Sequence, residues 1–307
     1  MSTNEWALVI FTVVMQMAVG SFVMLGGVHF FATRRNGIEE ADKLSDRSLF
    51  AIGPIVVVGL LVTFLHLGNP INAPRAITNF ATSWLSREIV LSLAFVIGGA
   101  VFALMQWRKV GSASIRIAVG VVVAAIGLVL VYTMSMIYRI PSIPAWDTVA
   151  TTLTFFVTAF LLGGMALGAA FVANFWYIRS KKMDPKNVSY SMLATSLRWI
   201  ALISVALLGL QFIIIPLYLA QLATETLPAA SASLAIISVQ NSGIFALRLI
   251  LLFIGAGLLS IFVYSMTSSE SRVRVMGNVA LLAFVLVLVS EILGRYLFYA
   301  SMVRIGL

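Results

Sequence analysis

Long apolar runs separated by short polar segments dominate the chain. Eight of these runs reach the length of about 20 residues that a helix needs to cross the hydrocarbon core of a bilayer. Because lipid offers no hydrogen-bond partner to backbone N–H and C=O groups, we expect each run to be helical. The predicted helices lie near residues 6–32, 48–67, 87–107, 115–138, 148–178, 197–220, 242–266 and 275–300. The pattern predicts an all-α integral membrane protein, an eight-transmembrane-helix bundle in which residues 1–307 form a single membrane domain.

Composition agrees with this fold class and narrows the function. Of the 307 residues, 61% are hydrophobic and only 10% are charged, whereas average soluble chains carry about 25% charged residues. The net charge of +9 is spread over the connections, so we interpret it as a signal of orientation in the lipid bilayer and not of nucleic-acid binding. The sequence has no cysteine, which excludes disulfides, thiolate zinc sites and cysteine-held iron–sulfur clusters within this chain.

The distribution of Lys and Arg predicts the orientation. Fourteen basic residues lie in four connections on one side of the predicted membrane, and four lie in the connections and chain ends on the other. Since basic residues collect on the cytoplasmic side, both termini are expected on the periplasmic side of a bacterial inner membrane. The first run has Arg34 and Arg35 behind it and not ahead of it, so we interpret it as a retained transmembrane helix and not as a signal peptide. The basic connections are 33–47, 106–116, 179–198 and 267–274.

An imidazole and a carboxylate are expected at one depth of this membrane. His66 ends the second apolar run and Glu88 begins the third. Oxidation of a quinol releases two protons together with two electrons, and such a pair at the lipid boundary suits proton transfer. Each residue also has a structural interpretation, because Gly68 and Pro70 place His66 in a last helical turn, and Ser86 is a candidate N-cap ahead of Glu88. We predict a functional site at His66 and Glu88.

Further polar and aromatic residues are expected on the same side as this pair. Some lie in the connection that joins the second and third runs, others lie between the fourth and fifth runs, and Gln16 lies about ten residues into the first run. They either line a quinol pocket or form an aromatic belt and helix–helix hydrogen bonds. The candidate quinol-binding residues are Gln16, Arg75, Trp84, Tyr138, Arg139 and Asp147.

Three ionisable residues are expected inside the last two spans. Glu291 and Arg295 are four residues apart and therefore share a helix face, and Arg248 lies in the outer half of the preceding span. They form either a neutralised structural network or the site of a secondary transporter, which is the alternative function. His29 is the only histidine besides His66 and lies at the opposite membrane end, so we expect no haem held by two histidines.

Several segments resemble the membrane-anchor subunit of the anaerobic dimethyl sulfoxide reductase family of molybdoenzymes. They are NEWALVIFT at 4–12, HLGNP at 66–70, SWLSRE at 83–88 and IPAW at 143–146. The resemblance implies a subunit without haem or iron–sulfur cluster that oxidises menaquinol near the periplasmic face, with His66 and Glu88 at the quinol site. This chain would then act on the quinol and not on the terminal electron acceptor.

The same resemblance implies two protein partners and a role in anaerobic respiration. Electrons would pass to a ferredoxin-like subunit with four iron–sulfur clusters and then to a molybdopterin catalytic subunit. The outer connections 68–87 and 221–241 carry little charge and several apolar side chains, as expected for a permanent protein interface. They are the predicted docking surface for the iron–sulfur subunit.

Overall fold

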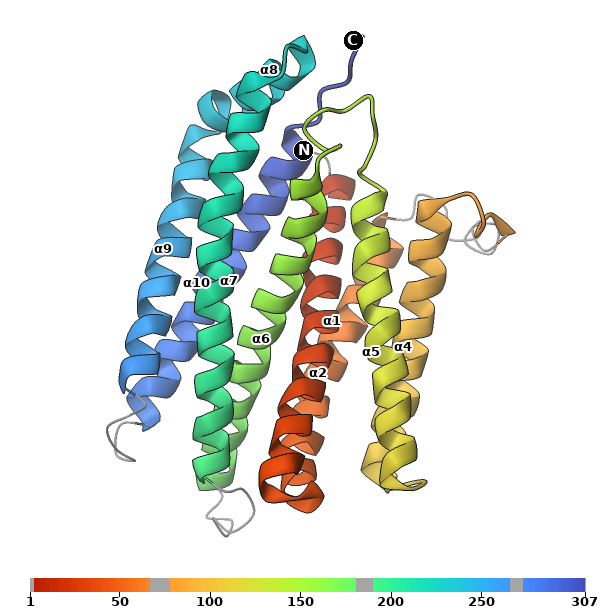
Figure 1. Cartoon of the computed structure of the whole chain (residues 1–307), viewed down its shortest axis with the longest axis vertical. Helices are drawn as coiled ribbons and strands as arrows, with labels where there is room; N and C mark the ends of the chain where they lie inside the picture. Colours follow the sequence, from red (N-terminus) through yellow and green to blue (C-terminus); the bar gives the residue numbers. More distant parts are fainter. Residues whose placement is uncertain (1–2, 67–77, 181–189, 266–272, 307) are drawn as a thin grey trace.

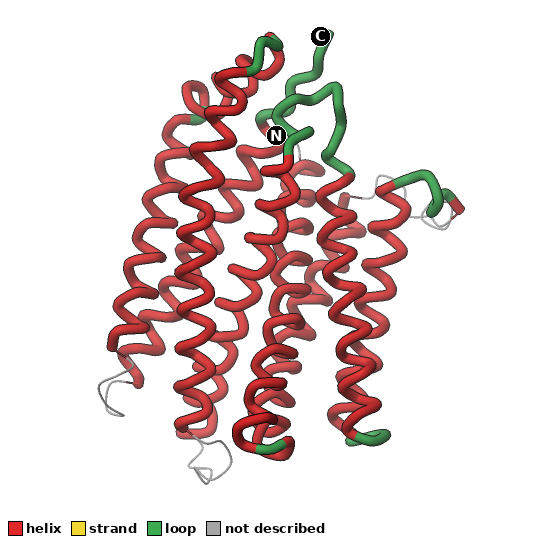
Figure 2. The backbone as a smooth tube through the Cα atoms, in the orientation of Figure 1, coloured by secondary structure: helices red, strands yellow, loops and turns green. Residues whose placement is uncertain are grey.

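The computed structural model describes residues 3–66, 78–180, 190–265 and 273–306. Within these ranges the chain forms long helices arranged side by side, and it contains no strand (Figures 1 and 2). The helices are α1 Thr3–Asn36, α2 Ile38–His66, α4 Trp84–Arg108, α5 Ala113–Met136, α6 Val149–Ser180, α7 Tyr190–Thr224, α8 Pro228–Ala235, the π-helical turn η3 Ile236–Gln240, α9 Ser242–Ser265 and α10 Val273–Ala300.

Seven of these helices are long and apolar enough to cross a membrane. They are α1, α4, α5, α6, α7, α9 and α10, and each covers one of the predicted spans. The predicted all-helical membrane architecture is therefore confirmed. The helix α2 covers the remaining predicted run, 48–67, up to His66.

The predicted connection at 33–47 is wrong in its extent. The helix α1 continues to Asn36 and α2 already begins at Ile38, so only Gly37 separates them. Gly37 has a φ of 87°, a left-handed conformation that glycine adopts without a steric penalty. Hydropathy detects only the lipid-immersed part of a helix, whereas acidic residues in the first turn of α2, Glu39 and Glu40, favour continuation of the helix into water.

The end of the bundle with this turn carries many basic side chains, and we call it the basic end. Asp42 accepts hydrogen bonds there from Lys109 at 2.9 Å and from Gln106 at 2.7 Å. Burial raises the pKa of Asp42, but the bonds from Lys109 and His29 outweigh this effect, and the pKa lies below its ordinary value. These contacts join α2 to α4, and the bond from His29 joins α2 to α1.

The helix α1 begins and α10 ends at the opposite end of the bundle, which we call the terminal end (Figure 1). Residues 137–148 connect α5 and α6 there. The indole Nε1 of Trp146 donates a hydrogen bond to the Phe298 carbonyl at 2.7 Å, and the Tyr218 hydroxyl donates to the Ala145 carbonyl at 3.0 Å. These bonds hold the connection against α7 and α10.

The helices α1 and α6 cross closely in the middle of the bundle. A Cβ atom on Gly20 would overlap the Ala159 carbonyl, and one on Gly163 would overlap the backbone of Gly20. The Ser21 hydroxyl donates a hydrogen bond to the Gly163 carbonyl at 3.1 Å across the same crossing. Small residues permit such an approach of two backbones, and it joins the group α1, α2, α4 and α5 to the group α6, α7, α9 and α10.

Candidate functional site

Glu88 lies near the start of α4, at the terminal end. The N-cap of α4 is Ser83, which has extended backbone angles and accepts a hydrogen bond from the Ser86 N–H at 3.3 Å. The expectation that Ser86 caps this helix is wrong, because the helix begins one turn earlier, at Trp84, and Ser86 is buried within the first turn. The earlier start brings Glu88 into the second turn, where it is only 6% exposed.

The Glu88 carboxylate lies within electrostatic reach of Tyr138. Burial raises the pKa of Tyr138 well above its ordinary value, and the neighbouring Tyr299 and Glu88 raise it further. No residue in the described part of the chain donates a hydrogen bond to Glu88. A buried carboxylate is costly without a donor or a cation, so Glu88 is a candidate for proton exchange or for an additional partner.

The other member of the predicted pair is His66. The helix α2 ends at His66, and α2 packs against α4. The side chain of His66 and the whole of Arg75 lie outside the described residues. The pairing of His66 with Glu88 therefore stays a prediction.

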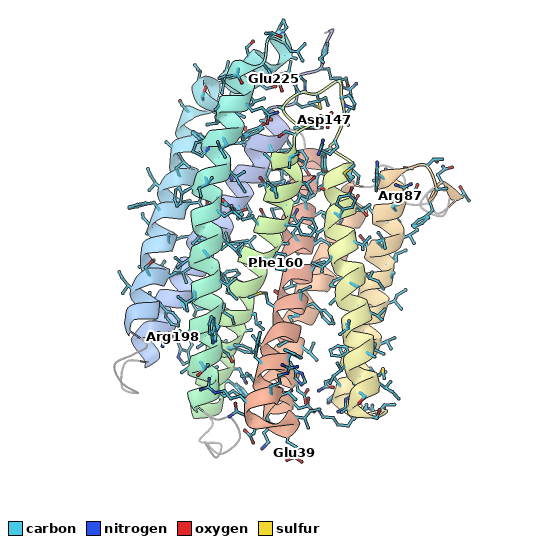
Figure 3. The ribbon with its side chains drawn as sticks, in the orientation of Figure 1. Glu39, Arg87, Asp147, Phe160, Arg198 and Glu225 are labelled. Atoms are coloured by element: carbon cyan, nitrogen blue, oxygen red, sulfur yellow. The ribbon has the colours of Figure 1, made fainter. Side chains whose placement is uncertain are left out.

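Aromatic and basic side chains surround the start of α4. The rings of Trp84 and Tyr132 meet edge to face with centroids 6.1 Å apart, and the Arg87 guanidinium lies 4.1 Å from the Trp84 ring. Arg139 and Asp147 form a partly exposed ion pair at 2.7 Å in the next connection. Figure 3 labels Arg87 and Asp147 near the terminal end. Arg139 and Asp147 thus neutralise each other.

Tyr138 is buried in a cluster of aromatic rings. Its hydroxyl shares a hydrogen bond of 2.8 Å with the Tyr299 hydroxyl. The rings of Trp146, Phe155 and Phe298 have centroids 5.4, 5.7 and 5.3 Å from that of Tyr138. Sequence reasoning missed Tyr299, although Glu291, Arg295 and Tyr299 are spaced by four residues and therefore share one face of α10.

Gln16 is fully buried and contacts another helix. Its side-chain carbonyl accepts a hydrogen bond from Arg295 at 2.9 Å. The Arg295 guanidinium also lies 3.8 Å from the centroid of the Phe155 ring. The amide nitrogen of Gln16 is buried and has no hydrogen-bond partner among the described residues.

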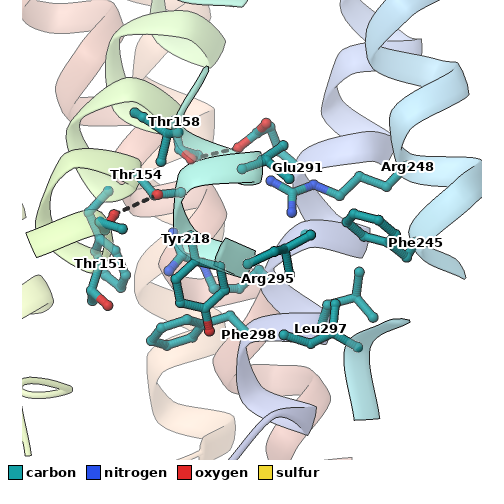
Figure 4. Close-up of a pocket in the computed structure, with 17 residues that line it drawn as sticks. Thr151, Thr154, Thr158, Tyr218, Phe245, Arg248, Glu291, Arg295, Leu297 and Phe298 are labelled. Carbon is teal, nitrogen blue, oxygen red and sulfur yellow. Dashed lines mark hydrogen bonds between the residues drawn. The ribbon is translucent and has the colours of Figure 1, made fainter. Parts of the chain in front are cut away.

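Glu291, the buried Arg295 and the half-buried Arg248 line one cavity of about 70 Å³ (Figure 4). Glu291 accepts hydrogen bonds of 2.6 Å from Thr158 and of 2.6 Å from Gln211. Arg248 approaches the backbone of Gly294 so closely that a Cβ there would lie 2.7 Å from the guanidinium carbon. In the described residues no ion pair joins Glu291 to either arginine. Sequence reasoning placed the three residues together and missed Thr158 and Gln211.

Potential metal ligands in the described part of the chain do not form a cluster that could hold a metal ion. No group of three or more histidine, cysteine, aspartate or glutamate residues forms a possible metal site within the described ranges. His29 forms a 2.9 Å contact through its Nε2 atom with Asp42 at the basic end, whereas α2 ends with His66 at the terminal end.

Comparison with known proteins gives the family. The family model described as DMSO reductase anchor subunit (DmsC) matches residues 1–301. The chain belongs to this family. Among its relatives, the chain is 33% identical over 169 residues to "Anaerobic dimethyl sulfoxide reductase chain YnfH" of Escherichia coli, covering 54% of this chain and 57% of that one. It is 28% identical over 188 residues to one subunit of the sulfite dehydrogenase of Allochromatium vinosum, covering 55% and 54%.

These alignments span little more than half the length of the curated relatives. A solved structure of bd oxidase from Geobacillus thermodenitrificans matches with a TM-score of 0.71 and 12% identity, covering 97% of this chain and 85% of that chain. At this identity the similarity shows the fold alone. The resemblance predicted from the sequence is confirmed. With seven apolar spans, this member of the anchor-subunit family is a multi-pass protein of the bacterial inner membrane.

Proposed function

We propose that this chain anchors a molybdoenzyme complex in the membrane and oxidises a quinol, with menaquinol as the substrate that the family resemblance suggests. The proposal rests on Glu88, whose side chain is buried near the start of α4, at the terminal end of the bundle. Glu88 acts as the proton acceptor together with His66, which ends α2. The family match supports the anchor role.

The surroundings of Glu88 support a site for an amphipathic ring. Trp84 and Tyr132 present aromatic faces between α4 and α5, and an apolar wall suits a quinol ring and its tail. In this proposal Trp84 and Arg75 contact the quinol directly. The other four candidates bind partners within the chain and do not contact the quinol in this proposal. They are Gln16, Tyr138, Arg139 and Asp147.

The electrons leave through partner subunits. The chain has no cysteine to hold an iron–sulfur cluster, so a ferredoxin-like subunit at the terminal end receives the electrons and passes them to a molybdopterin subunit. The α8 helix and the η3 turn, which lie at this end (Figure 1), contribute the apolar docking surface together with the connection that precedes α4.

The proposal includes the topology. Residues 1–307 form one membrane domain, α2 crosses the bilayer as an eighth span, and both termini face the periplasm. The excess of basic residues at the basic end supports this orientation. The quinol protons are then released on the periplasmic side, where Glu88 lies.

The test replaces Glu88 by Gln in the whole complex. The variant should lose quinol-dependent reduction of the terminal acceptor by roughly 10²- to 10⁴-fold, because proton transfer by a positioned group contributes about that factor. Activity with a soluble artificial donor, which reduces the partner subunits directly, should be unchanged. Steady-state assays with both donors on membranes of known complex content provide the measurement.

The matched control is Glu39→Gln, the same chemical change at an exposed position at the basic end of the bundle, where Figure 3 labels Glu39. This variant should keep both activities. If Glu88→Gln keeps quinol oxidation, the proposed role of Glu88 is wrong. Equal loss with both donors would show failed assembly, and His66→Gln then provides an independent test of the site.

The transporter alternative has less support. Arg248, Glu291 and Arg295 do line one cavity, but transporter sites are commonly built from helices that are interrupted near the midplane. The helix α7 continues through Pro216 without interruption, and the described parts of α9 and α10 are likewise continuous.

A further inference from the structure

A groove at the basic end lies between α1 and α7. It has a volume of about 740 Å³, within the range of about 300–1,000 Å³ that is typical of small-molecule sites. Its deep part is lined by apolar residues and by Gly27, and its mouth by Arg34, Arg35 and Asn36. The groove is remote from Glu88, which lies at the terminal end of α4.

The length of the groove matches one leaflet of a bilayer. On α1 its lining extends from Met24 to Asn36 and on α7 from Ile203 to Met192. At 1.5 Å per residue these stretches measure about 18 Å and about 16 Å. One leaflet contributes about 15 Å of hydrocarbon, so the groove reaches from the headgroup region to about the midplane.

The mouth of the groove carries two arginines that no carboxylate of the described residues neutralises. Arg34 and Arg35 are exposed, and in the described ranges neither forms an ion pair with a carboxylate. Arg34 instead lies over the Phe30 ring at 4.4 Å. By contrast, Lys109 at the same end of the bundle binds Asp42 and Asp46. A pair of unneutralised guanidinium groups above an apolar groove complements a phosphate headgroup with an acyl chain.

Large apolar side chains along the groove are consistent with lipid contact. Phe31 is 72% exposed and Trp199 is 62% exposed, one on each helix that borders the groove. The buried Ser196 adds a polar group at the same end.

We propose that this groove binds one anionic phospholipid, whose phosphate contacts Arg34 and Arg35 and whose acyl chain lies along Met24, Gly27 and Ile203. The lipid fills the space between α1 and α7, two helices that are joined through α6. This site is independent of the proposed quinol oxidation.

The test measures lipid binding to the purified whole complex by native mass spectrometry. The complex is delipidated and titrated with dioleoylphosphatidylglycerol or with dioleoylphosphatidylcholine. The wild type should retain one phosphatidylglycerol in preference to phosphatidylcholine. The double variant Arg34→Gln/Arg35→Gln should bind phosphatidylglycerol roughly 30-fold more weakly, the equivalent of about 2 kcal/mol at about 1 kcal/mol per basic residue. The matched control is Arg108→Gln, because Arg108 also lies over an aromatic ring, that of Trp107 at 4.9 Å, and does not line the groove.

A second variant tests the part of the groove that holds the acyl chain, without changing the charge of the protein. A Cβ on Gly27 would have no neighbour within 4 Å, so Gly27→Leu places a larger apolar side chain in the groove and should weaken binding of both lipids. The control Gly257→Leu makes the same change at an equally open position on α9 and should bind as the wild type does. The proposal is overturned if phosphatidylglycerol binds no more tightly than phosphatidylcholine, or if neither the arginine nor the Gly27 variant weakens binding.

Discussion

Arg248 and Arg295, the two arginines that line the Glu291 cavity, should respond differently to the same substitution. Arg295 makes a 3.8 Å contact with the Phe155 ring and a hydrogen bond to Gln16. A dry cation–π contact contributes about 2 kcal/mol, and a charged hydrogen bond about 1.5–3 kcal/mol. Replacement of Arg295 also removes the desolvation cost of burying its charge, which offsets part of the lost stabilisation. We therefore expect Arg295→Met to lower the free energy of unfolding by about 3 kcal/mol.

Arg248→Met is the internal comparison. In the described residues the Arg248 side chain makes no hydrogen bond or ion pair, and its buried Nε atom has no partner. Loss of its electrostatic interaction with Glu291 offsets the gain from removing the unsatisfied Nε, so Arg248→Met should change the free energy of unfolding by less than about 1 kcal/mol. The two variants should therefore differ in unfolding free energy by about 2–4 kcal/mol, which is at least roughly 30-fold in the unfolding equilibrium.

The assay is unfolding by sodium dodecyl sulfate in mixed micelles, followed by far-ultraviolet circular dichroism. Addition of Gln16→Met to Arg295→Met should cost less than Gln16→Met alone, with a coupling energy of about 1–2 kcal/mol. Equal loss of stability in Arg248→Met and Arg295→Met would refute the reasoning, because it would mean that burial of charge and not specific contacts determines the effect.

Three further outcomes are expected. Gly163→Ala should destabilise the protein by about 1–3 kcal/mol in the same assay, because the new methyl group meets the backbone of α1, whereas Gly26→Ala, in open space, should be neutral. Asp42→Asn should lower the thermal midpoint at neutral pH, because the lowered pKa of Asp42 means that its ionised form stabilises the fold. The difference from the wild type should shrink as the pH falls below about 4, where Asp42 becomes protonated in the wild type. Tyr138→Phe should cost about 1 kcal/mol through loss of the bond to Tyr299, and it should leave the pH profile of quinol oxidation unchanged at neutral pH because the pKa of Tyr138 lies well above its ordinary value.

The sequence located His66 at the end of α2 and Glu88 near the start of α4, because each stands at the end of an apolar run. Their pairing at a quinol site stays a prediction. The hydrogen-bond partners of Gln16, Tyr138 and Glu291 were not found. Each partner lies on a helix distant in the sequence, so its identity depends on how the helices are rotated and how closely they cross.

The sequence by itself determined the all-helical membrane class, the positions of the spans and the end of the bundle that carries the basic residues. These properties are local, because each span must satisfy its own backbone hydrogen bonds in lipid. The tertiary structure alone decided the one-residue turn at Gly37, the close crossing at Gly20 and Gly163, and the groove beneath Arg34 and Arg35. Apolar residues are equally soluble in lipid on every face of a helix, so hydropathy does not specify which faces meet, and steric fit between small residues determines the packing.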